Sequence, residues 1–228
     1  MSVQYCCLAK NFSEVNPAVP TLLHFSPSLL SLSHRVVGAQ VVLQGEPEST
    51  AVALLNAGAT KVFLGEAALF DSTVVSRLVR TFGSQRIGLQ VPVQRQSVSW
   101  SFETESNEDF NVVTPSLCEP VWEVLKTNAE SSGVRAVNWV DAMLQHGVGT
   151  VLLRADLSDN TDLNLCAGMV ELVADKLWVA PLTDTAPVLA DWISFGQVSR
   201  LALPTALYHR RHVLVKRDGA QGTSVSTS

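Results

Sequence analysis

The sequence predicts an α/β protein that folds as a (β/α)8 TIM barrel of compact and degenerate form. The first observation behind this prediction is that eight short, almost continuously apolar segments recur along the 228 residues. Such segments are typical of strands buried on both faces of a parallel sheet. The second is that segments of helical periodicity separate most of them, as in parallel sheets covered by helices. Eight strands suggest a closed barrel, for which about 200 residues is a low but sufficient length.

The predicted strands follow one another at fairly regular intervals. Only residues 10–20 separate the first strand from the second, and Pro17 and Pro20 leave little room there for a helix. We therefore expect the first helix to be short or missing. The eight strands are predicted at residues 4–9, 21–26, 40–44, 61–65, 86–93, 150–155, 177–180 and 200–203.

Helices are predicted where apolar residues recur at helical spacing. The helix at residues 50–57 ends before Gly58, which suits a C-terminal cap. Asp71 and Ser72 can cap a helix that continues to Gly83. The remaining helices are predicted at residues 136–145, 163–174 and 186–194.

We expect a single barrel domain over residues 1–215, interrupted by an insertion at about residues 94–134 after the fifth strand. Residues 97–104 alternate like an exposed strand, which predicts a β-hairpin within the insertion. Residues 216–228 include many Gly, Ser and Thr residues and are expected to form a disordered polar tail.

Composition excludes several classes of protein. Apolar residues make up 46% of the chain and charged residues only 16%, which is the opposite of a disordered sequence. No apolar run approaches the roughly 18 residues that a membrane-spanning helix needs. The net charge of −5 comes without a basic tract, so nucleic acid is not the expected partner. A surface so poor in charge suggests instead that other protein covers part of it.

The four cysteines and five histidines show neither the spacing of a disulfide framework nor that of a metal site. We therefore expect reduced cysteines in an intracellular protein, with no metal and no cofactor. The first 38 residues hold few charges and no clear amphipathic period. The cytoplasm and the mitochondrion both stay open as the compartment.

Several segments resemble a known family of barrel enzymes. Residues 51–65 and 80–85 are similar to the cyclase subunit of imidazole glycerol phosphate synthase, which belongs to histidine biosynthesis. Its sister, the phosphoribosylformimino-aminoimidazole carboxamide ribotide isomerase, shares the barrel. Residues 136–139, 147–153 and 208–213 continue the resemblance, which covers about residues 4–213.

The resemblance implies two catalytic carboxylates that this chain lacks. In the cyclase they stand on the first and fifth strands and act as general acid and base. Ala9 occupies the expected position on the first strand, and Val91 with Pro92 occupies it on the fifth. No Asp or Glu occurs between Gln85 and Glu103, so a shifted alignment does not restore the second group. We therefore expect no catalytic residues.

The phosphate loops of the family are altered as well. Phosphates at such barrel mouths bind to backbone N–H groups of glycine-rich loops and short helix N-termini. The third strand here is followed by Gly45 and Glu46, and Pro181 and Pro204 stand where further donors are needed. Glu66, after the fourth strand, would repel a phosphate. A phosphate ligand is therefore not expected.

One loop keeps part of the family pattern. Residues 154–161 resemble the family's Asp-x-Asp-Gly-Thr loop, with Asp159 and Thr161 in matching positions. Two interpretations stay open, namely a remnant of a ligand loop and a turn whose Asp159 caps the following helix. If the chain is an enzyme after all, Asp156 and Asp184 join Asp159 as the carboxylates best placed to serve.

Trp100, Phe102 and Phe110 in the insertion would form an apolar surface for a protein partner. The leading hypothesis is a pseudoenzyme, a barrel that serves as a structural or accessory subunit of a larger assembly or of a homo-oligomer. The alternative is a divergent but active cyclase or related phosphoribosyl isomerase. A third reading is a sensor that binds a small ligand at the mouth without chemistry, and the fold alone does not decide among them.

Overall fold

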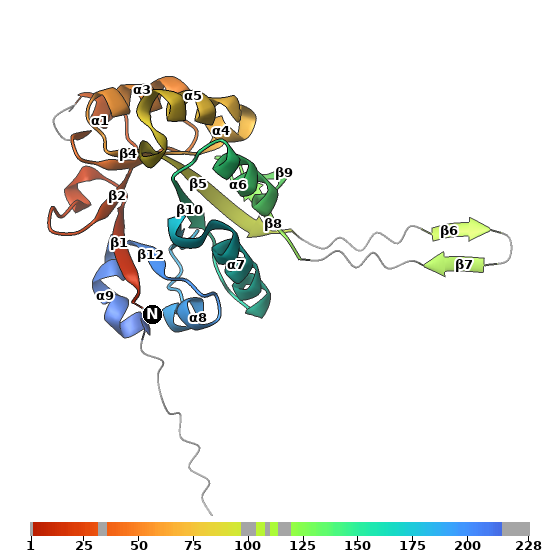
Figure 1. Cartoon of the computed structure of the whole chain (residues 1–228). Coiled ribbons are helices and arrows are strands. Elements are labelled where there is room, and N and C mark those ends of the chain that lie inside the picture. Colours follow the sequence, from red (N-terminus) through yellow and green to blue (C-terminus); the bar gives the residue numbers. More distant parts are fainter. Residues whose placement is uncertain (1, 32–35, 97–103, 108–109, 114–119, 216–228) are drawn as a thin grey trace, which may run out of the picture.

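The computed structural model describes residues 2–31, 36–96, 104–107, 110–113 and 120–215. Eight parallel strands form a ring in which β10 pairs with β5 and thereby closes the barrel (Figure 1). The predicted (β/α)8 barrel is therefore confirmed. In ring order the strands are β1 (Gln4–Ala9), β2 (Thr21–His24), β3 (Gln40–Val42), β4 (Lys61–Leu64), β5 (Ile87–Arg95), β10 (Thr150–Arg154), β11 (Leu177–Ala180) and β12 (Arg200–Pro204).

Helices surround the ring of strands (Figure 1). None of those in the described part of the chain is long and apolar enough to cross a membrane. The helices are α1 (Ser28–Ser31), α3 (Glu48–Asn56), α4 (Glu66–Phe70), α5 (Thr73–Phe82), α6 (Ala136–Gln145), α7 (Asn160–Val173), α8 (Leu189–Ser194) and α9 (Thr205–Val215), and 3-10 turns occur at Phe12–Glu14, Ser84–Arg86 and Ala174–Lys176.

Local sequence explains where the α5 helix begins and ends. The carboxylate of Asp71 accepts a hydrogen bond from the backbone N–H of Thr73 at 3.0 Å and so caps the first turn. Gly83 ends the helix with φ of +87°, a left-handed conformation that glycine adopts without a steric penalty.

The first helix of the barrel is reduced to a single turn, as the sequence predicts. Between β1 and β2 the chain forms only the 3-10 turn Phe12–Glu14, and Pro17 and Pro20 follow it. Asn11 caps this turn by accepting a hydrogen bond from the Ser13 backbone at 3.1 Å. The segment that joins β1 to β2 is therefore mostly loop rather than a helix.

The insertion after β5 contains more structure than the sequence suggests. β8 (Trp122–Leu125) pairs antiparallel with the end of β5, and β9 (Ser131–Arg135) pairs antiparallel with β8. We did not predict this second hairpin, because its strands are short and partly polar. The expected hairpin is present as β6 (Thr104–Asn107) and β7 (Phe110–Val113), a separate two-stranded sheet. Its first strand was expected at residues 97–104, of which 97–103 lie outside the described residues.

A packed core fills the inside of the barrel. Side chains alternate along each strand, so that one set points inward and the other packs against the helices. β5 contributes Gly88 to the inside, where an added Cβ atom would lie only 2.6 Å from the ring of Phe63. The absence of a side chain at Gly88 thus leaves room for this ring. The buried inner cluster comprises Cys6, Leu8, Leu22, Val42, Phe63, Leu152, Ala180 and Ala202.

Candidate functional site

The carboxyl ends of the eight strands meet at one end of the barrel, where barrel enzymes carry their active sites. The inward-facing side chains continue past the packed core into this mouth. Those that line its two cavities include His24, Gln44, Gln90, Pro92, Arg154 and Leu182. From the sequence we had considered two of these, namely Pro92, which replaces an expected carboxylate, and Arg154, the first residue of the loop at 154–161.

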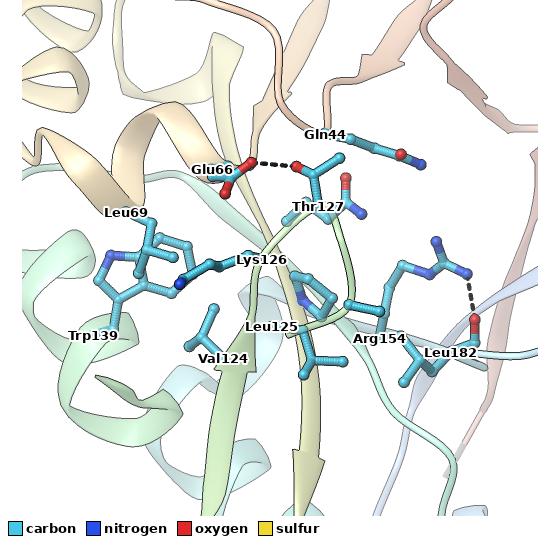
Figure 2. Close-up of a pocket in the computed structure, with 14 residues that line it drawn as sticks. Gln44, Glu66, Leu69, Val124, Leu125, Lys126, Thr127, Trp139, Arg154 and Leu182 are labelled. Atoms are coloured by element: carbon cyan, nitrogen blue, oxygen red, sulfur yellow. Dashed lines mark hydrogen bonds between the residues drawn. The ribbon is translucent and has the colours of Figure 1, made fainter. Parts of the chain in front are cut away.

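One cavity, with a volume of about 150 Å³, lies between the mouth and the turn that joins β8 to β9. Figure 2 shows Trp139 and Leu69 on one side, Arg154 and Leu182 on the other, and Lys126 with Thr127 between them. The hydroxyl of Thr127 donates a hydrogen bond to the carboxylate of Glu66, which ties the turn to the start of α4 (Figure 2). The β8–β9 turn therefore partly covers the mouth.

Gly45 allows the β8–β9 turn to lie close to the loop that follows β3. A Cβ atom added at Gly45 would lie 2.9 Å from Oγ1 of Thr127. Such a contact is too short without a shift of the turn, so the glycine after β3 serves the packing of this turn here.

Arg154 at the end of β10 stays within the mouth. Its Nη2 donates hydrogen bonds to the carbonyl oxygens of Leu182 at 2.8 Å and Pro181 at 3.2 Å. Burial lowers the pKa of the guanidinium, and the nearby carboxylates of Asp156 and Asp184 partly oppose that effect. The side chain is still a cation at neutral pH, because arginine does not lose its proton in proteins.

Lys10 extends this cationic character to the rim of the mouth, where His24 also lies. Both line a second, more open cavity of about 360 Å³, to which Gln44, Arg154 and Asp184 also contribute. Burial, followed by the charges of Arg154 and Lys10, lowers the pKa of His24 to about 4. His24 is therefore neutral at pH 7, and Lys10 and Arg154 are the cations of this cavity.

The carboxylates that we considered as substitutes for catalytic groups hold structural partners. Oδ1 of Asp156 accepts hydrogen bonds from the backbone N–H groups of Leu182 at 3.0 Å and Thr183 at 3.2 Å, which fixes the loop after β11. Asp184 forms an exposed ion pair with Lys10, with 3.1 Å between Oδ2 and Nζ. A catalytic role for either residue stays a prediction.

The backbone donors that a phosphate would need are also occupied. The N–H of Gln44 after β3 donates to the carboxylate of Glu46 at 2.6 Å. The N–H of Glu66 after β4 donates to the carbonyl of Gln44 at 2.7 Å. After β11, Asp156 takes the N–H groups of Leu182 and Thr183. These loops therefore offer an anion few unpaired donors.

The ends of β1 and β5 present no acidic side chain to the mouth. Pro92 faces the cavity, whereas Val91 packs outward against the helices. On β1 our assignment needs a correction, because Ala9 also belongs to the outer core, whereas Leu8 faces the inner core and Lys10 lines the mouth. Alternation along the strand explains the difference, since Cys6 and Leu8 share one face and Ala9 lies on the other.

The loop with the partial family pattern begins helix α7. Asp159 is the N-cap of this helix, and its Oδ1 accepts a hydrogen bond from the N–H of Asp162 at 3.0 Å. Its two oxygens also accept hydrogen bonds from Nη1 of Arg95 at 2.8 and 2.7 Å. The bond from the backbone of Asp162, and then that from Arg95, lower the pKa of Asp159. Thr161 lines an open groove beside Arg95, and a ligand role for the pair Asp159 and Thr161 stays a prediction.

The substitution Asp159→Ala is expected to lower the melting temperature by about 2–4 °C, because it removes the cap of α7. Asp159→Asn should lose much less, since an asparagine side chain caps a helix as well as an aspartate does. Thermal unfolding followed by circular dichroism measures both. Equal losses for the two variants would mean that the ion pair with Arg95, and not the cap, stabilises this loop.

The predicted partner surface lies mostly beyond the part that the structure describes. Trp100 and Phe102 are outside the described residues, and Phe110 is the first residue of β7. We did not predict His24, Gln44 or Gln90 as site residues from the sequence. For Gln90 a signal was available, because it is a polar residue in an otherwise apolar strand.

Comparisons with known proteins agree with the resemblance that the sequence predicts. A family model described as "Histidine biosynthesis protein" matches residues 46–159, which is half of the chain. The imidazole glycerol phosphate synthase subunit HisF of Bifidobacterium adolescentis is 29% identical over 124 residues, covering 54% of this chain and 43% of the relative. The subunit HisF of Methanosphaerula palustris is 26% identical over 162 residues, covering 68% of this chain and 58% of the relative. The chain thus spans about half the length of these curated relatives.

Proposed function

Because this chain belongs to the histidine biosynthesis protein family, we propose that it is a catalytically degenerate barrel that acts as a structural or accessory subunit of a larger protein assembly. The observation that carries the proposal is the chemistry of the side chains that face the mouth. On the first strand, alternation from Leu8 brings Lys10 to the mouth, and on the fifth strand Pro92 faces it. Neither is a carboxylate, so the two carboxylates that the cyclase resemblance implies as acid and base have no counterpart at these positions.

The acids that are present near the mouth support the same proposal. Asp156 binds two backbone N–H groups, Asp159 caps a helix, and Asp184 pairs with Lys10. Recruiting one of them for proton transfer would cost the fold a loop contact, a cap or an ion pair.

The occupied loop donors argue against a phosphorylated substrate. Phosphate recognition at a barrel mouth relies on unpaired backbone N–H groups. Glu46 and Asp156 take those donors here, and Glu66 adds a negative charge beside the cavity. We infer that the mouth does not bind the phosphate groups of the family's substrates.

Exposed apolar side chains support a role in an assembly. Phe70 at the end of α4 is 73% exposed and Val37 is 67% exposed. Val37 lies at a groove of about 700 Å³ to which Val15 and Val19 also contribute, next to the place where the first helix is reduced to a turn. Such apolar surface is typical of protein contacts. The partner is another protein or a second copy of this chain.

A genetic complementation experiment tests the loss of catalysis. The chain is expressed in a bacterial strain that lacks its cyclase subunit, and growth without histidine is scored. We expect no growth, whereas the HisF subunit of Bifidobacterium adolescentis, expressed to the same level, should restore it. Growth supported by this chain would overturn the proposal.

The alternative function is a divergent, active cyclase or phosphoribosyl isomerase. The polar cavity at the mouth, with Gln90 and Arg154 in its wall, is the observation that favours it. If the chain supports growth, the variants Asp156→Asn and Asp184→Asn identify the carboxylate involved. Loss of growth in one of them, with the protein level unchanged, would support the alternative.

A further inference from the structure

Gln90 carries an unpaired polar atom inside the cavity below the β8–β9 turn. The side chain is only 3% exposed, and its Oε1 has no hydrogen-bond partner among the described residues. Buried polar atoms in native proteins almost always have a partner, so each exception calls for an explanation. An acceptor that is unpaired in the wall of a cavity is explained if a bound molecule donates to it.

A second unpaired group lines the same cavity. Trp139 on α6 is 7% exposed, and its Nε1–H, a donor, also has no partner among the described residues. The same wall contains the guanidinium of Arg154, the ammonium group of Lys126 and the carboxylate of Glu66, together with apolar side chains. The cavity therefore offers hydrogen-bond acceptors, donors and apolar surface.

The size of the cavity limits what it can hold. Its volume of about 150 Å³ equals that of an engineered protein cavity that binds benzene. One six-membered ring with a small polar substituent therefore matches this volume. The polar wall distinguishes it from the benzene-binding cavity, which is entirely apolar.

We propose that this cavity is a binding site for a small, uncharged, planar molecule with an amide-like edge, such as a ring lactam. Its N–H donates to Oε1 of Gln90, and its carbonyl oxygen accepts from Arg154, while the ring of Trp139 packs against it. A carboxylate anion of the same size has no N–H that could donate to Oε1 of Gln90. The proposal is independent of the accessory role, since an accessory subunit can bind such a ligand or lack it.

Matched probes test the polar edge. 2-Pyridone has the required N–H and C=O on a six-membered ring, N-methyl-2-pyridone lacks the N–H, and benzene lacks both. Ligand-observed NMR on the full chain measures the dissociation constant of each probe. We expect 2-pyridone to bind at least tenfold more tightly than N-methyl-2-pyridone and benzene. Equal binding of the three probes, or binding of none, would overturn the proposal, since water alone would then explain the unpaired groups.

Variants locate the site. Gln90→Leu should weaken 2-pyridone binding at least tenfold without lowering the melting temperature, because it replaces an unpaired amide with an apolar group of similar volume. Gln90→Met provides a second variant if the branched side chain does not fit. Gln145→Leu, on the exposed face of α6, is the matched control and should leave binding unchanged. Unchanged binding in both Gln90 variants would place the probe elsewhere and refute the site.

The indole N–H of Trp139 gives an independent readout. In a ¹⁵N-labelled chain its signal is identified by its loss in Trp139→Phe. Addition of 2-pyridone should shift this signal and leave that of Trp178, at the opposite end of the barrel, in place. Equal shifts of the Trp139 and Trp178 signals, or no shift of the Trp139 signal, would contradict the proposed position of the ligand.

Discussion

Replacing Phe63 with alanine is expected to lower the free energy of unfolding by about 3–5 kcal/mol, the largest effect that we predict for a single substitution. The ring of Phe63 is fully buried inside the barrel and lies against Gly88 of the next strand. Gly88 has no side chain that could fill the space that its removal leaves, and the closed ring of strands resists collapse inward. The variant loses the transfer free energy of the buried ring, and the cavity that remains destabilises it further.

Chemical denaturation with urea measures this change. Phe70→Ala is the matched control, because the same side chain is removed from a position that is 73% exposed. That variant should change the free energy of unfolding by no more than about 0.5 kcal/mol. A loss below about 1 kcal/mol for Phe63→Ala would mean that the inside of the barrel is not packed as described.

Acidification from pH 7 to pH 4 is expected to destabilise the protein by about 2–3 kcal/mol through His24 alone. Burial and the charges of Arg154 and Lys10 lower the pKa of His24 from its ordinary 6.5 to about 4 in the folded state. Between pH 6.5 and about pH 4 the unfolded chain binds a proton at His24 and the folded chain does not. Proton binding therefore favours the unfolded state more and more as the pH falls through this window. Above pH 6.5 both states leave His24 neutral, and this destabilisation is absent.

The variant His24→Gln isolates this contribution. It keeps a polar side chain of similar length beside Gln44 but cannot titrate. The difference in free energy of unfolding between pH 7 and pH 4 should be smaller by about 2–3 kcal/mol in the variant. His146→Gln is the control, since His146 lies on the outside of the barrel, where its ring is hydrogen-bonded to Ser76 at 2.8 Å. If His24→Gln retains the full acid sensitivity, the mouth does not impose the charge environment that we describe.

The sequence predicted the ring of strands well because burial on both faces leaves a simple pattern. β1 and β11 occur at the predicted residues, and the other six strands differ from prediction only at their ends. In a parallel barrel each strand must be apolar on its inner and its outer face. The resulting continuous runs, such as 150–155, contrast clearly with the amphipathic helices between them.

The β8–β9 hairpin could not be predicted in the same way. β8 has four residues, Trp122 to Leu125, and β9 is polar apart from Val134. Their pairing with β5 depends on contacts made across the fold, and such contacts decide the fate of short strands more than local sequence does. The cavity below this hairpin was therefore also missed.

The mouth was predicted only in part because resemblance identifies a position along the chain but not the direction of its side chain. Ala9 matched the family position by sequence, yet the inner packing of Cys6 and Leu8 turns Ala9 outward. A strict count of alternate residues along β5, from Gly88 through Gln90 to Pro92, would have found the polar residue that faces the cavity. Strand periodicity was thus the unused signal.

Native mass spectrometry of the tagged protein, purified gently from the cells that make it, tests the central claim most directly. A catalytically degenerate accessory barrel should be found in a stable assembly, with its partner or with further copies of itself in fixed stoichiometry. A free monomer, or a simple pair with a glutaminase, would contradict the accessory role, and turnover by such a species would contradict the loss of catalysis as well.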